Sequence, residues 1–351
     1  MKLIKMPSID QFRGVVANVN RTHTFVGLDD QGEAIYDHSI PKPTLKFTGT
    51  IKLHGTCASA CFNETDGIWA QSKDNIITPQ KDNAGFAFFV ESKKEAFKGI
   101  FEKIKEKYGI DTKENTISIF GEWCGPSIQK GVSISQMPEK TMFIFGIKIS
   151  NNFDAEVASY WANCNEFNDN DNRIFNIHDF KTYEIDIDFN TPQLSQNKII
   201  EYTIEVENQC PVGMHFGIDG IGEGIVFSAM NPDGRSRLIF KSKGEKHSNS
   251  KVRTLKHVDN EKINKIIDVA EKVTPAWRLE QMMTETFDLN NGGVIERNKL
   301  GEYIKRVIAD VIKEDMDILV ENGLEIKDLG KYISDISRTY FFEQERNNLG
   351  V

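Results

Sequence analysis

The stretch Thr50-Ile51-Lys52-Leu53-His54-Gly55-Thr56 decides the fold that we expect for this chain. Apolar and polar residues alternate in it, which predicts a strand whose apolar pair faces the core and whose Lys52 and His54 share the other face. A glycine then ends the strand in a turn. A lysine at a strand end, taken alone, is most often an edge residue that discourages aggregation. The interpretation of Lys52 therefore depends on which residues follow.

The composition limits the class of protein. The chain has 351 residues, of which 39% are hydrophobic, enough for two domains or for one large domain with an appendage. No stretch approaches the ~20 apolar residues that span a bilayer, and the residues after Met1 lack the apolar run of a secretory signal. Five scattered cysteines fit reduced thiols better than a disulfide framework or a zinc site. We therefore expect a cytoplasmic protein.

The net charge of −9 argues against a protein that coats nucleic acid nonspecifically. A local basic groove is still compatible with it, because a cleft focuses the field more than the total charge does. The segment from Arg235 to Lys256 is rich in Lys and Arg. It is either one side of such a groove or a solvated positive face.

Four further apolar strands carry residues that could form a site with Lys52. They are Thr116–Trp123 with Glu122, Met142–Ile149 with Phe145, Glu223–Phe227 with Glu223, and Leu238–Lys243 with Lys241 and Lys243. The period of two places Lys241 and Lys243 on one face of their strand. Taken singly, each residue has a simpler explanation as a strand-end charge or a core aromatic.

Turn and helix signals predict the remaining elements before the last lysine strand. Residues 1–49 are expected to form a strand-and-hairpin lead-in, with a short apolar run at Val15, Val16 and Val19 as the strand and hairpin strands at 25–28 and 34–36. Strands at 60–62 and 68–70 flank a turn. A helix is expected over 92–108, where Ser92 and Glu95 form a capping box.

After Lys251 the sequence is helical in character. Helices are expected from Asn260 to a stop at Thr274-Pro275, and over 277–287, 298–319 and 326–342. Residues 288–295 are similar to a calcium loop, but Lys299 stands where the loop needs its bidentate glutamate. We expect an interhelical turn there. An alternating pattern typical of a five-stranded OB barrel is absent from this part of the sequence.

The order and spacing of these motifs resemble the covalent nucleotidyltransferases, the superfamily of polynucleotide ligases and messenger RNA capping enzymes. Lys-x-His-Gly-Thr at 52–56 and the segment Phe120 to Lys130 resemble the RNA ligase 2 family of phages and the trypanosome RNA-editing ligases. DNA ligases and capping enzymes typically have aspartate in place of His54 and an OB barrel after the last lysine motif. The similarity runs from about Thr50 to Lys251.

The resemblance implies an α+β fold with two domains. Residues 1–252 would form an adenylyltransferase domain of antiparallel sheets with flanking helices, and residues 253–351 a helical domain that assists engagement of the nick. The implied enzyme is an ATP-dependent RNA ligase that seals 3′-OH and 5′-phosphate ends at nicks in duplex RNA or an RNA/DNA hybrid. It would use ATP and Mg²⁺, with Mn²⁺ as a substitute, and act as a monomer in the cytoplasm, that of the host if a phage encodes it.

The resemblance also assigns roles to the residues singled out above. Lys52 would become adenylylated, and Ile51 would lie beside it in the ATP pocket. Glu122 would bind the ribose, Phe145 would stack on adenine, and Glu223 would hold the divalent metal ion. Lys241 and Lys243 would contact the α-phosphate. His54 would act after lysine adenylylation by engaging the phosphate of the nick.

The chemistry explains why these residue types are needed. A 5′-phosphate needs a leaving group before a 3′-hydroxyl can attack it, and a lysine can carry AMP from ATP as a phosphoramidate. Lys52 must attack as the neutral amine. Two nearby cations, Lys241 and Lys243, would favour that neutral form and would neutralise the charge that builds on the α-phosphate.

Three positions depart from the best-known phage pattern. Cys57 stands where that pattern has asparagine, and a thiol lacks the amide donors. Lys73 replaces an arginine and cannot offer a bidentate fork to a phosphate. Gly146 stands where an acid is common. The departures at Cys57 and Lys73 concern contacts with the nick, which we expect these two residues to form with His54.

Two alternatives remain at this point. A DNA ligase would share the ATP chemistry, although His54 and the helical tail weigh against it. A noncatalytic binder of nucleotide or RNA would keep the fold without the transfer. The joint presence of Lys52, Glu122, Glu223 and the two later lysines weighs against such a loss.

Overall fold

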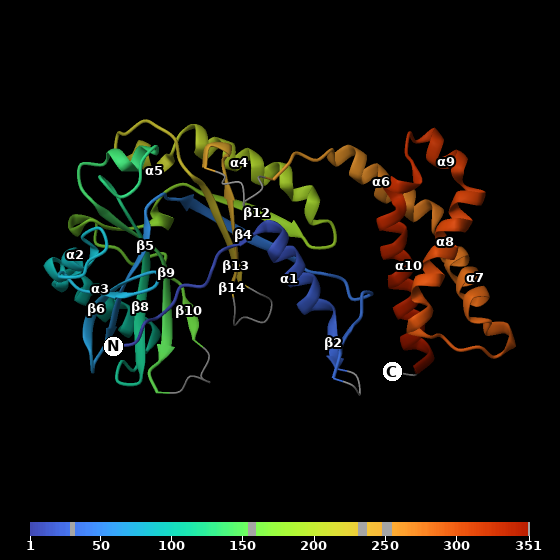
Figure 1. The fold of residues 1–351 in the computed structure, drawn as a ribbon, viewed down its shortest axis with the longest axis horizontal. Coiled ribbons are helices and arrows are strands. Elements are labelled where there is room, and N and C mark those ends of the chain that lie inside the picture. Colours follow the sequence, from blue (N-terminus) through green and yellow to red (C-terminus); the bar gives the residue numbers. More distant parts are fainter. Residues whose placement is uncertain (29–31, 154–158, 231–236, 248–254, 350–351) are drawn as a thin grey trace. The chain divides into compact units, whose positions relative to one another are not determined.

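The computed structural model describes residues 1–28, 32–153, 159–230, 237–247 and 255–349. The chain divides into two compact units, both drawn in Figure 1. Unit 1 comprises Met1–Val15, Leu45–Ile187 and Asn197–Lys256, and unit 2 comprises Val16–Thr44, Asp188–Gln196 and His257–Val351. The predicted domain boundary at 252/253 lies outside the described residues and stays a prediction. The predicted α+β class, with antiparallel sheets followed by a helical C-terminal region, is confirmed.

The first sheet of unit 1 has five strands in the order β1-β14-β13-β4-β12. Its strands are β1 (Asp10–Gln11), β4 (Thr44–Lys52), β12 (Thr182–Asp188), β13 (Gly224–Met230) and β14 (Arg237–Lys243). Strand β13 pairs antiparallel with both β4 and β14, while β1 runs parallel to β14. The predicted strands that carry Lys52, Lys241 and Lys243 are therefore near neighbours in one sheet.

The second sheet of unit 1 has the order β10-β9-β8-β5-β6-β7, with β11 paired to β9. Its strands are β5 (Thr56–Asn63), β6 (Gly67–Ser72), β7 (Ile76–Ile77), β8 (Asn115–Cys124), β9 (Thr141–Asn151), β10 (Tyr160–Ala162) and β11 (Ile174–Asn176). The strands predicted at 60–62, 68–70, 116–123 and 142–149 are confirmed by β5, β6, β8 and β9. Glu122 and Phe145 thus belong to a different sheet from Lys52.

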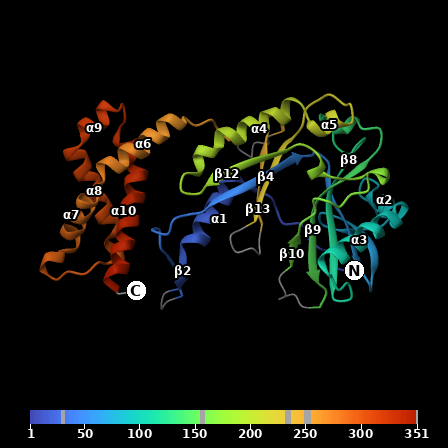
Figure 2. The same cartoon turned by 180° about the vertical axis from the view of Figure 1, so that it is seen from behind.

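Helices cover one face of each sheet in unit 1. Helices α2 (Phe86–Ser92) and α3 (Lys94–Tyr108) pack their apolar residues against β5, β8 and β9 in one core cluster. On the five-stranded sheet, α4 (Gln196–Asn208) is held by a hydrogen bond of 2.8 Å from Thr203 Oγ1 to Ser242 Oγ, and Figure 2 shows it beside β12. A short helix α5 (Pro211–His215) follows. Ser242 lies between Lys241 and Lys243 in sequence, so the two lysines face away from α4.

The helix predicted over 92–108 is confirmed by α3, which spans Lys94–Tyr108, but its predicted capping box is wrong. Ser92 ends α2, where its Oγ donates to the carbonyl of Phe89 at 2.9 Å. Lys93 precedes α3 and makes no side-chain cap. Ser92 cannot cap α3 because its hydroxyl already closes the last turn of α2.

Unit 2 is mainly helical. Its described elements are the greater part of α1 (Phe12–Thr24), the hairpin of β2 (Phe25–Leu28) and β3 (Ala34–Tyr36), and α6 (Asn260–Val273), α7 (Ala276–Phe287), α8 (Leu300–Glu314), α9 (Met316–Glu321) and α10 (Ile326–Leu349). Asp259 caps α6 as predicted by accepting from Lys262 N at 2.8 Å. The hairpin is confirmed, whereas its turn at 29–31 lies outside the described residues.

Two predicted elements of unit 2 differ from the structure. The run Val15 to Val19 is part of helix α1 and not a strand, because the two valines are four residues apart and are both buried on one helical face. The helix predicted over 298–319 is divided at Asp315 into α8 and α9. Asp315 forms an ion pair with the buried guanidinium of Arg278. The same guanidinium forms a second ion pair with Asp310, at 2.8 Å.

The structure also contains short 3₁₀ turns. These are η1 (Ser133–Gln136), η2 (Asn170–Asn172), η3 (Ile177–Asp179), η4 (Pro192–Ser195), η5 (Glu245–His247), η6 (Leu289–Asn291) and η7 (Arg297–Lys299). Turn η6 occupies the segment that is similar to a calcium loop, in agreement with the predicted interhelical turn. Across the described ranges, no helix is both long enough and apolar enough to cross a membrane.

Candidate active site

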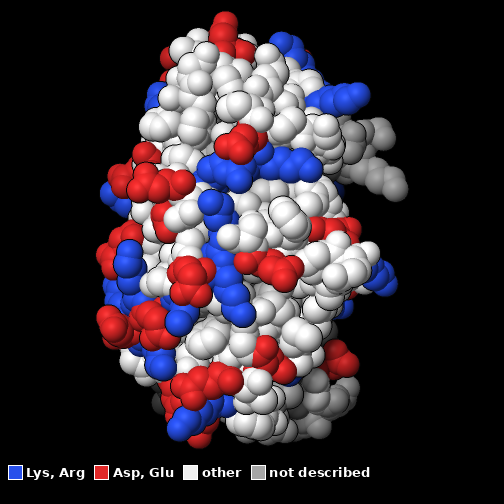
Figure 3. All heavy atoms as spheres, turned by 90° about the vertical axis from the view of Figure 1, so that its left-hand side faces the viewer, with Lys and Arg blue, Asp and Glu red and all other residues white. Residues whose placement is uncertain are grey.

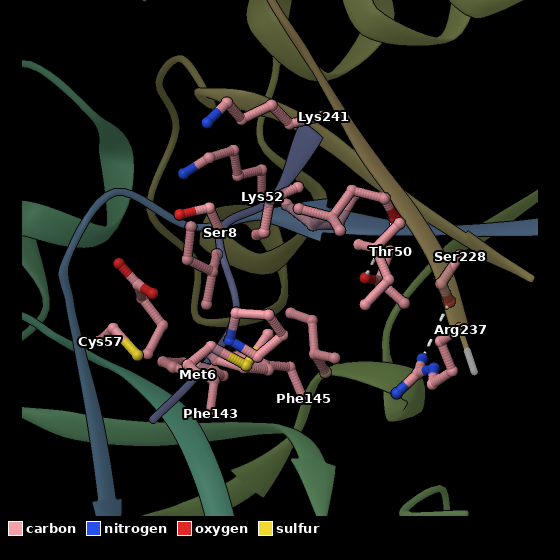
Figure 4. A pocket seen from close by; sticks show the side chains of 18 of the residues that line it. Met6, Ser8, Thr50, Lys52, Cys57, Phe143, Phe145, Ser228, Arg237 and Lys241 are labelled. Carbon is pink, nitrogen blue, oxygen red and sulfur yellow. Dashed lines mark hydrogen bonds between the residues drawn. The ribbon is translucent and has the colours of Figure 1, made fainter. Parts of the chain in front are cut away.

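A cavity of about 290 Å³ in unit 1 is lined by residues of both sheets. The five-stranded sheet contributes the open face of β4, β13 and β14, including Thr50, Lys52 and Lys241. The seven-stranded sheet contributes Glu122 from β8 and Phe145 from β9. The sequence-predicted site residues thus come together from two separate sheets. Figure 4 shows Lys52 and Lys241 at one end of the cavity and Phe145 at the other.

Strand register brings two lysines to one point. Gly224 of β13 lies opposite Lys52 of β4 on one side and opposite Lys243 of β14 on the other. Gly224 has φ +146°, and a Cβ there would lie 2.1 Å from the carbonyl oxygen of Ser242. A side chain at this position is therefore sterically excluded. The backbones of the neighbouring strands approach closely at Gly224. The carboxylate of the preceding residue, Glu223, lies between the amines of Lys52 and Lys243.

Glu223 is the centre of the charged cluster. Its Oε2 accepts from Lys52 Nζ at 2.7 Å and lies 3.4 Å from His54 Nδ1, while its Oε1 is 2.6 Å from Lys243 Nζ. The side chain is only 2% exposed. Burial by itself would raise the pKa of Glu223, but the hydrogen bond with His54 and the cationic Lys52 and Lys243 hold it well below the usual range. Glu223 is thus an ionised acid that fixes the two lysines and the histidine.

Lys241 differs from the other two lysines. Its side chain extends into the cavity beside Lys52 (Figure 4), and no acid among the described residues lies within ion-pair distance of it. Burial and the positive charges of Lys243 and Lys52 lower its pKa. An amine in this state is available to an anionic ligand such as a phosphate group.

Glu122 contacts the turn that follows Lys52. Its Oε1 accepts from the backbone N–H of Gly55 at 3.0 Å. A Cβ on Gly55 would lie 2.4 Å from the carbonyl oxygen of Trp123, so only glycine permits this close contact between the turn and β8. Burial raises the pKa of Glu122 to about 7, against the lowering effect of Lys52. The carboxyl group therefore titrates near neutral pH.

If Glu122 binds the ribose of a nucleotide, as the sequence resemblance predicts, nucleotide affinity should rise as the pH rises through about 7, because a carboxylate accepts a hydrogen bond from a ribose hydroxyl more strongly than a carboxylic acid does. Between pH 8 and pH 6 the affinity for AMP should fall by up to about tenfold per unit below the pKa. Calorimetric titration with AMP at several pH values measures this affinity. Glu122→Gln, measured in parallel, controls for titration of the phosphate. An identical pH dependence in both proteins would contradict the prediction.

Phe145 lies at an irregularity in the second sheet. Phe120 of β8 pairs with Gly146, and the next residue, Gly121, pairs with Ile144, so Phe145 is an extra residue in β9. Such a β-bulge changes the direction of side chains along a strand. Ile144 and Ile147 on either side belong to the helix-covered core, whereas Phe145 lines the cavity and is half-buried. The bulge thus supplies an aromatic ring to the cavity wall.

The structure explains why glycine replaces an acid at position 146. A Cβ on Gly146 would lie 2.9 Å from the indole ring of Trp161 on β10. The guanidinium of Arg237 lies 5.7 Å from the centre of that ring and donates to Ser228 Oγ at 3.0 Å. Trp161 and Arg237 therefore occupy the space in which an acidic side chain would be placed.

Of the three residues predicted to contact the nick, Cys57 and Lys73 line the cavity, whereas His54 does not. Cys57, on β5, has its pKa raised to about 12, first by burial and then by the charge of Glu122. It is therefore a thiol at neutral pH and can offer only a weak donor. Lys73, which follows β6, is exposed. Whether these two residues contact nucleic acid stays a prediction.

The structure adds residues that the motifs did not indicate. Met6, Pro7, Ser8 and Ile9 line the cavity, and the ring of His247 packs edge-on against that of His54 at 5.5 Å. Arg237 could have been found from sequence, since it lies four residues before Lys241 and the period of two puts both on one strand face. The residues near the start of the chain carry no comparable pattern.

Metal binding would depend on few protein ligands. No group of three or more His, Cys, Asp or Glu in the described ranges is arranged to hold a metal ion. Mg²⁺ commonly uses one or two carboxylates together with substrate phosphates and waters. Glu223 does not itself line the cavity, but it is a single ionised carboxylate paired with Lys52 and Lys243, which do, and it fits that limited role.

The basic segment between Arg235 and Lys256 is described only in part, because residues 231–236 and 248–254 lie outside the described ranges. Its described residues include Arg237 and Lys241, which line the cavity. Figure 3 shows one face of the molecule, where a short band of Lys and Arg is surrounded by Asp and Glu. The Lys and Arg residues that line the cavity are Lys52, Lys73, Arg237, Lys241 and Lys243.

The site combines a cavity between two sheets with a strand-end lysine, two further lysines and two acids. This arrangement is expected of a covalent nucleotidyltransferase. A family model described as RNA ligase matches residues 45–243, more than half of the chain. The chain therefore belongs to the RNA ligase family. The matched region contains every predicted site residue from Lys52 to Lys243.

Comparison of structures finds a Naegleria gruberi RNA ligase with PPi, and mutants of it with AMP and Mn or with ATP and Mn. Sequence identity is 13–14% and the TM-score is 0.41. The matches cover 70% of this chain and 57% of the Naegleria chain, so this chain corresponds to little more than half of that protein. No curated protein sequence matches the chain.

Proposed function

We propose that the protein is an ATP-dependent RNA ligase that seals 3′-OH and 5′-phosphate ends at nicks in duplex RNA or an RNA/DNA hybrid. The observation that supports this most strongly is the cluster of Lys52, Lys243 and His54 around Glu223, beside Lys241, which forms no ion pair within the described part of the chain. A cavity that only bound a nucleotide would not require an amine at the strand end next to two further amines. Membership of the RNA ligase family supports RNA as the substrate.

In the first step the neutral amine of Lys52 attacks the α-phosphorus of ATP. A P–N bond forms, the bond from the α-phosphorus to the bridging oxygen breaks, pyrophosphate leaves and the amine gives up a proton to solvent. Lys241 and Lys243 stabilise the charge that develops on the α-phosphate. Glu122 binds the ribose, Phe145 stacks on the base, and Ile51 lies beside Lys52 in the pocket. The lysyl-AMP that results stores the activated nucleotide.

In the later steps the lysine is the leaving group. An oxygen of the RNA 5′-phosphate attacks the lysine-bound phosphorus, so that AMP moves to the RNA end and Lys52 is released. The 3′-hydroxyl then attacks the RNA phosphate, a phosphodiester forms and AMP departs. His54, with Cys57 and Lys73, would position the phosphate of the nick during these steps. His54 is suited to this role because it shares the carboxylate of Glu223 with Lys52.

Mg²⁺, when bound with ATP, would supply positive charge that neutralises the phosphates, and Mn²⁺ could replace it. Glu223 is the residue that would hold the ion. In the structure its two oxygens are occupied by Lys52 and Lys243. Binding of the ion would therefore compete with these ion pairs and would free the amines for the phosphates.

A comparison of nicked duplexes tests the substrate class. Four duplexes carry RNA or DNA on either side of the nick, opposite one common strand, and sealing is measured with ATP and Mg²⁺. We expect the all-RNA nick to be sealed at least about tenfold faster than the all-DNA nick, because a site built for RNA recognises the 2′-hydroxyl. Equal sealing of the all-DNA nick would contradict the RNA assignment and favour a DNA ligase.

A further inference from the structure

Residues near the start of the chain form a wall of the cavity. Met6, Pro7, Ser8 and Ile9 line it together with Lys52 and Lys241. We call residues 4–11 the N-terminal strap. They lie outside the region matched by the RNA ligase family model, which begins at residue 45.

The first end of the strap is fixed to the seven-stranded sheet. Gln71, on β6, is buried, and its side-chain amide pairs with the backbone of Ile4. Its Oε1 accepts from Ile4 N at 3.1 Å, and its Nε2 donates to the carbonyl of Ile4. Lys148 of β9 adds a weaker hydrogen bond of 3.4 Å to the carbonyl of Lys5. The strap therefore begins at a fixed point beside the cavity.

The second end is fixed to the five-stranded sheet. Asp10 and Gln11 form β1, which pairs in parallel with β14 and places Gln11 opposite Lys241. The next residue, Phe12, is buried with its ring 5.2 Å from that of Phe240. Five residues, 5–9, thus connect two sheets. A segment held at both ends has far fewer conformations than a free terminus.

Ser8 is the polar side chain that the strap presents to the cavity. Ser8 lines the same cavity as Lys52 and Lys241, and Figure 4 shows these three side chains in one part of the cavity. The hydroxyl forms no hydrogen bond with the described residues and is exposed to the cavity. A hydroxyl in a cavity that is also lined by lysine amines is a suitable donor for a phosphate oxygen.

We propose that Ser8 is a positioning residue that donates a hydrogen bond to the α-phosphate of a nucleoside 5′-phosphate. The inference rests on the proposed function, which brings that phosphate to Lys52. Lys52 and Lys241 approach the phosphate from the five-stranded sheet, and Ser8 closes the remaining side from the strap. Since the strap is anchored at both ends, the hydroxyl is in place before the nucleotide binds, and little ordering is needed on binding.

Ser8→Ala tests the contact by binding. We expect affinity for AMP to fall by roughly tenfold, the effect of one hydrogen bond to a charged group, while affinity for adenosine stays within about twofold. Ser92→Ala is the matched control, because Ser92 is exposed, lies in unit 1 and does not line the cavity. Calorimetry measures both ligands. An AMP affinity equal to that of the control, or an equal loss for adenosine, would overturn the proposal.

Gln71→Met tests the anchor separately. The methionine has a similar length but no amide, so Ile4 loses both hydrogen bonds to this side chain. We expect trypsin to cleave after Lys5 at least about fivefold faster, and AMP affinity to fall in the same direction as in Ser8→Ala. Circular dichroism verifies that the variant is folded. Faster cleavage with unchanged AMP affinity would show that the strap does not hold Ser8 for the phosphate.

The outcome can be separated from that of the proposed function. If the wild-type protein becomes labelled by α-labelled ATP but Ser8→Ala binds AMP like the control, only the strap inference is wrong. If the wild-type protein never becomes labelled but Ser8→Ala loses AMP and not adenosine, the strap inference stands and lysine adenylylation is wrong.

Discussion

Lys52→Ala is expected to lose transfer of label from α-labelled ATP to the protein, by at least about 1000-fold, because the variant lacks the amine that forms the P–N bond. Affinity for ATP should change by less than about tenfold, since Lys241 and Lys243 still face the phosphates. The thermal unfolding temperature should change little, because Glu223 keeps Lys243 and His54 as partners. The label on the protein is measured after incubation with ATP and Mg²⁺ by denaturing gel electrophoresis at neutral to alkaline pH, without exposure to acid.

A surface lysine provides the control for this experiment. Lys105→Ala removes an amine from an exposed pair with Glu64 on the same unit and should leave labelling unchanged. Label on Lys52→Ala at the level of this control would place the nucleophile elsewhere. Loss of both ATP binding and label would indicate damage to the cavity instead of loss of the nucleophile.

Glu223→Gln is expected to lower the rate of protein labelling by at least about 100-fold and to destabilise the protein by roughly 2–4 kcal/mol at pH 7, since it leaves two largely buried amines without their counter-charge. Glutamine has nearly the same size, so the loss would come from charge and not from packing. Chemical unfolding measures the free energy of unfolding, and the time course of labelling with α-labelled ATP and Mg²⁺ measures the rate of protein labelling.

The pH dependence gives this prediction a defined sign. The pKa of Glu223 is lowered in the folded protein, so its contribution to stability is present above the unfolded value of 4.5 and is lost as the pH falls below it. The difference between wild type and Glu223→Gln should therefore shrink below about pH 4.5. Glu184→Gln, in an exposed pair with Lys46, is the control and should change stability by less than about 1 kcal/mol. A difference that grows on acidification would contradict the assignment.

Much of the site could be predicted because it depends on strand periodicity. Lys52, Lys241 and Lys243 each lie at a strand position whose neighbours are apolar, so the face that they share follows from a period of two. Glu223 and Glu122 lie at or next to strand ends beside a glycine, where polar side chains can reach a cavity. The family resemblance supplied their order. In the structure Glu122 and the three lysines line one cavity, and Glu223 pairs with two of those lysines.

Other parts could not be predicted because they depend on contacts between distant segments. The hydrogen bonds between Gln71 and Ile4 that fix the strap involve a glutamine on a strand and an irregular backbone, neither of which has a periodic signal. The bulge at Phe145 depends on pairing with β8. The break between α2 and α3 depends on which of two possible helix ends Ser92 serves.

The most direct test of the account is to locate the AMP on the protein. Wild-type protein is incubated with ATP and Mg²⁺, digested and mapped by mass spectrometry without exposure to acid, which cleaves phosphoramidates. We predict AMP on the side chain of Lys52 and its loss when nicked RNA is added. AMP on a different residue, or sealing of RNA by a protein that never carries AMP, would contradict the account.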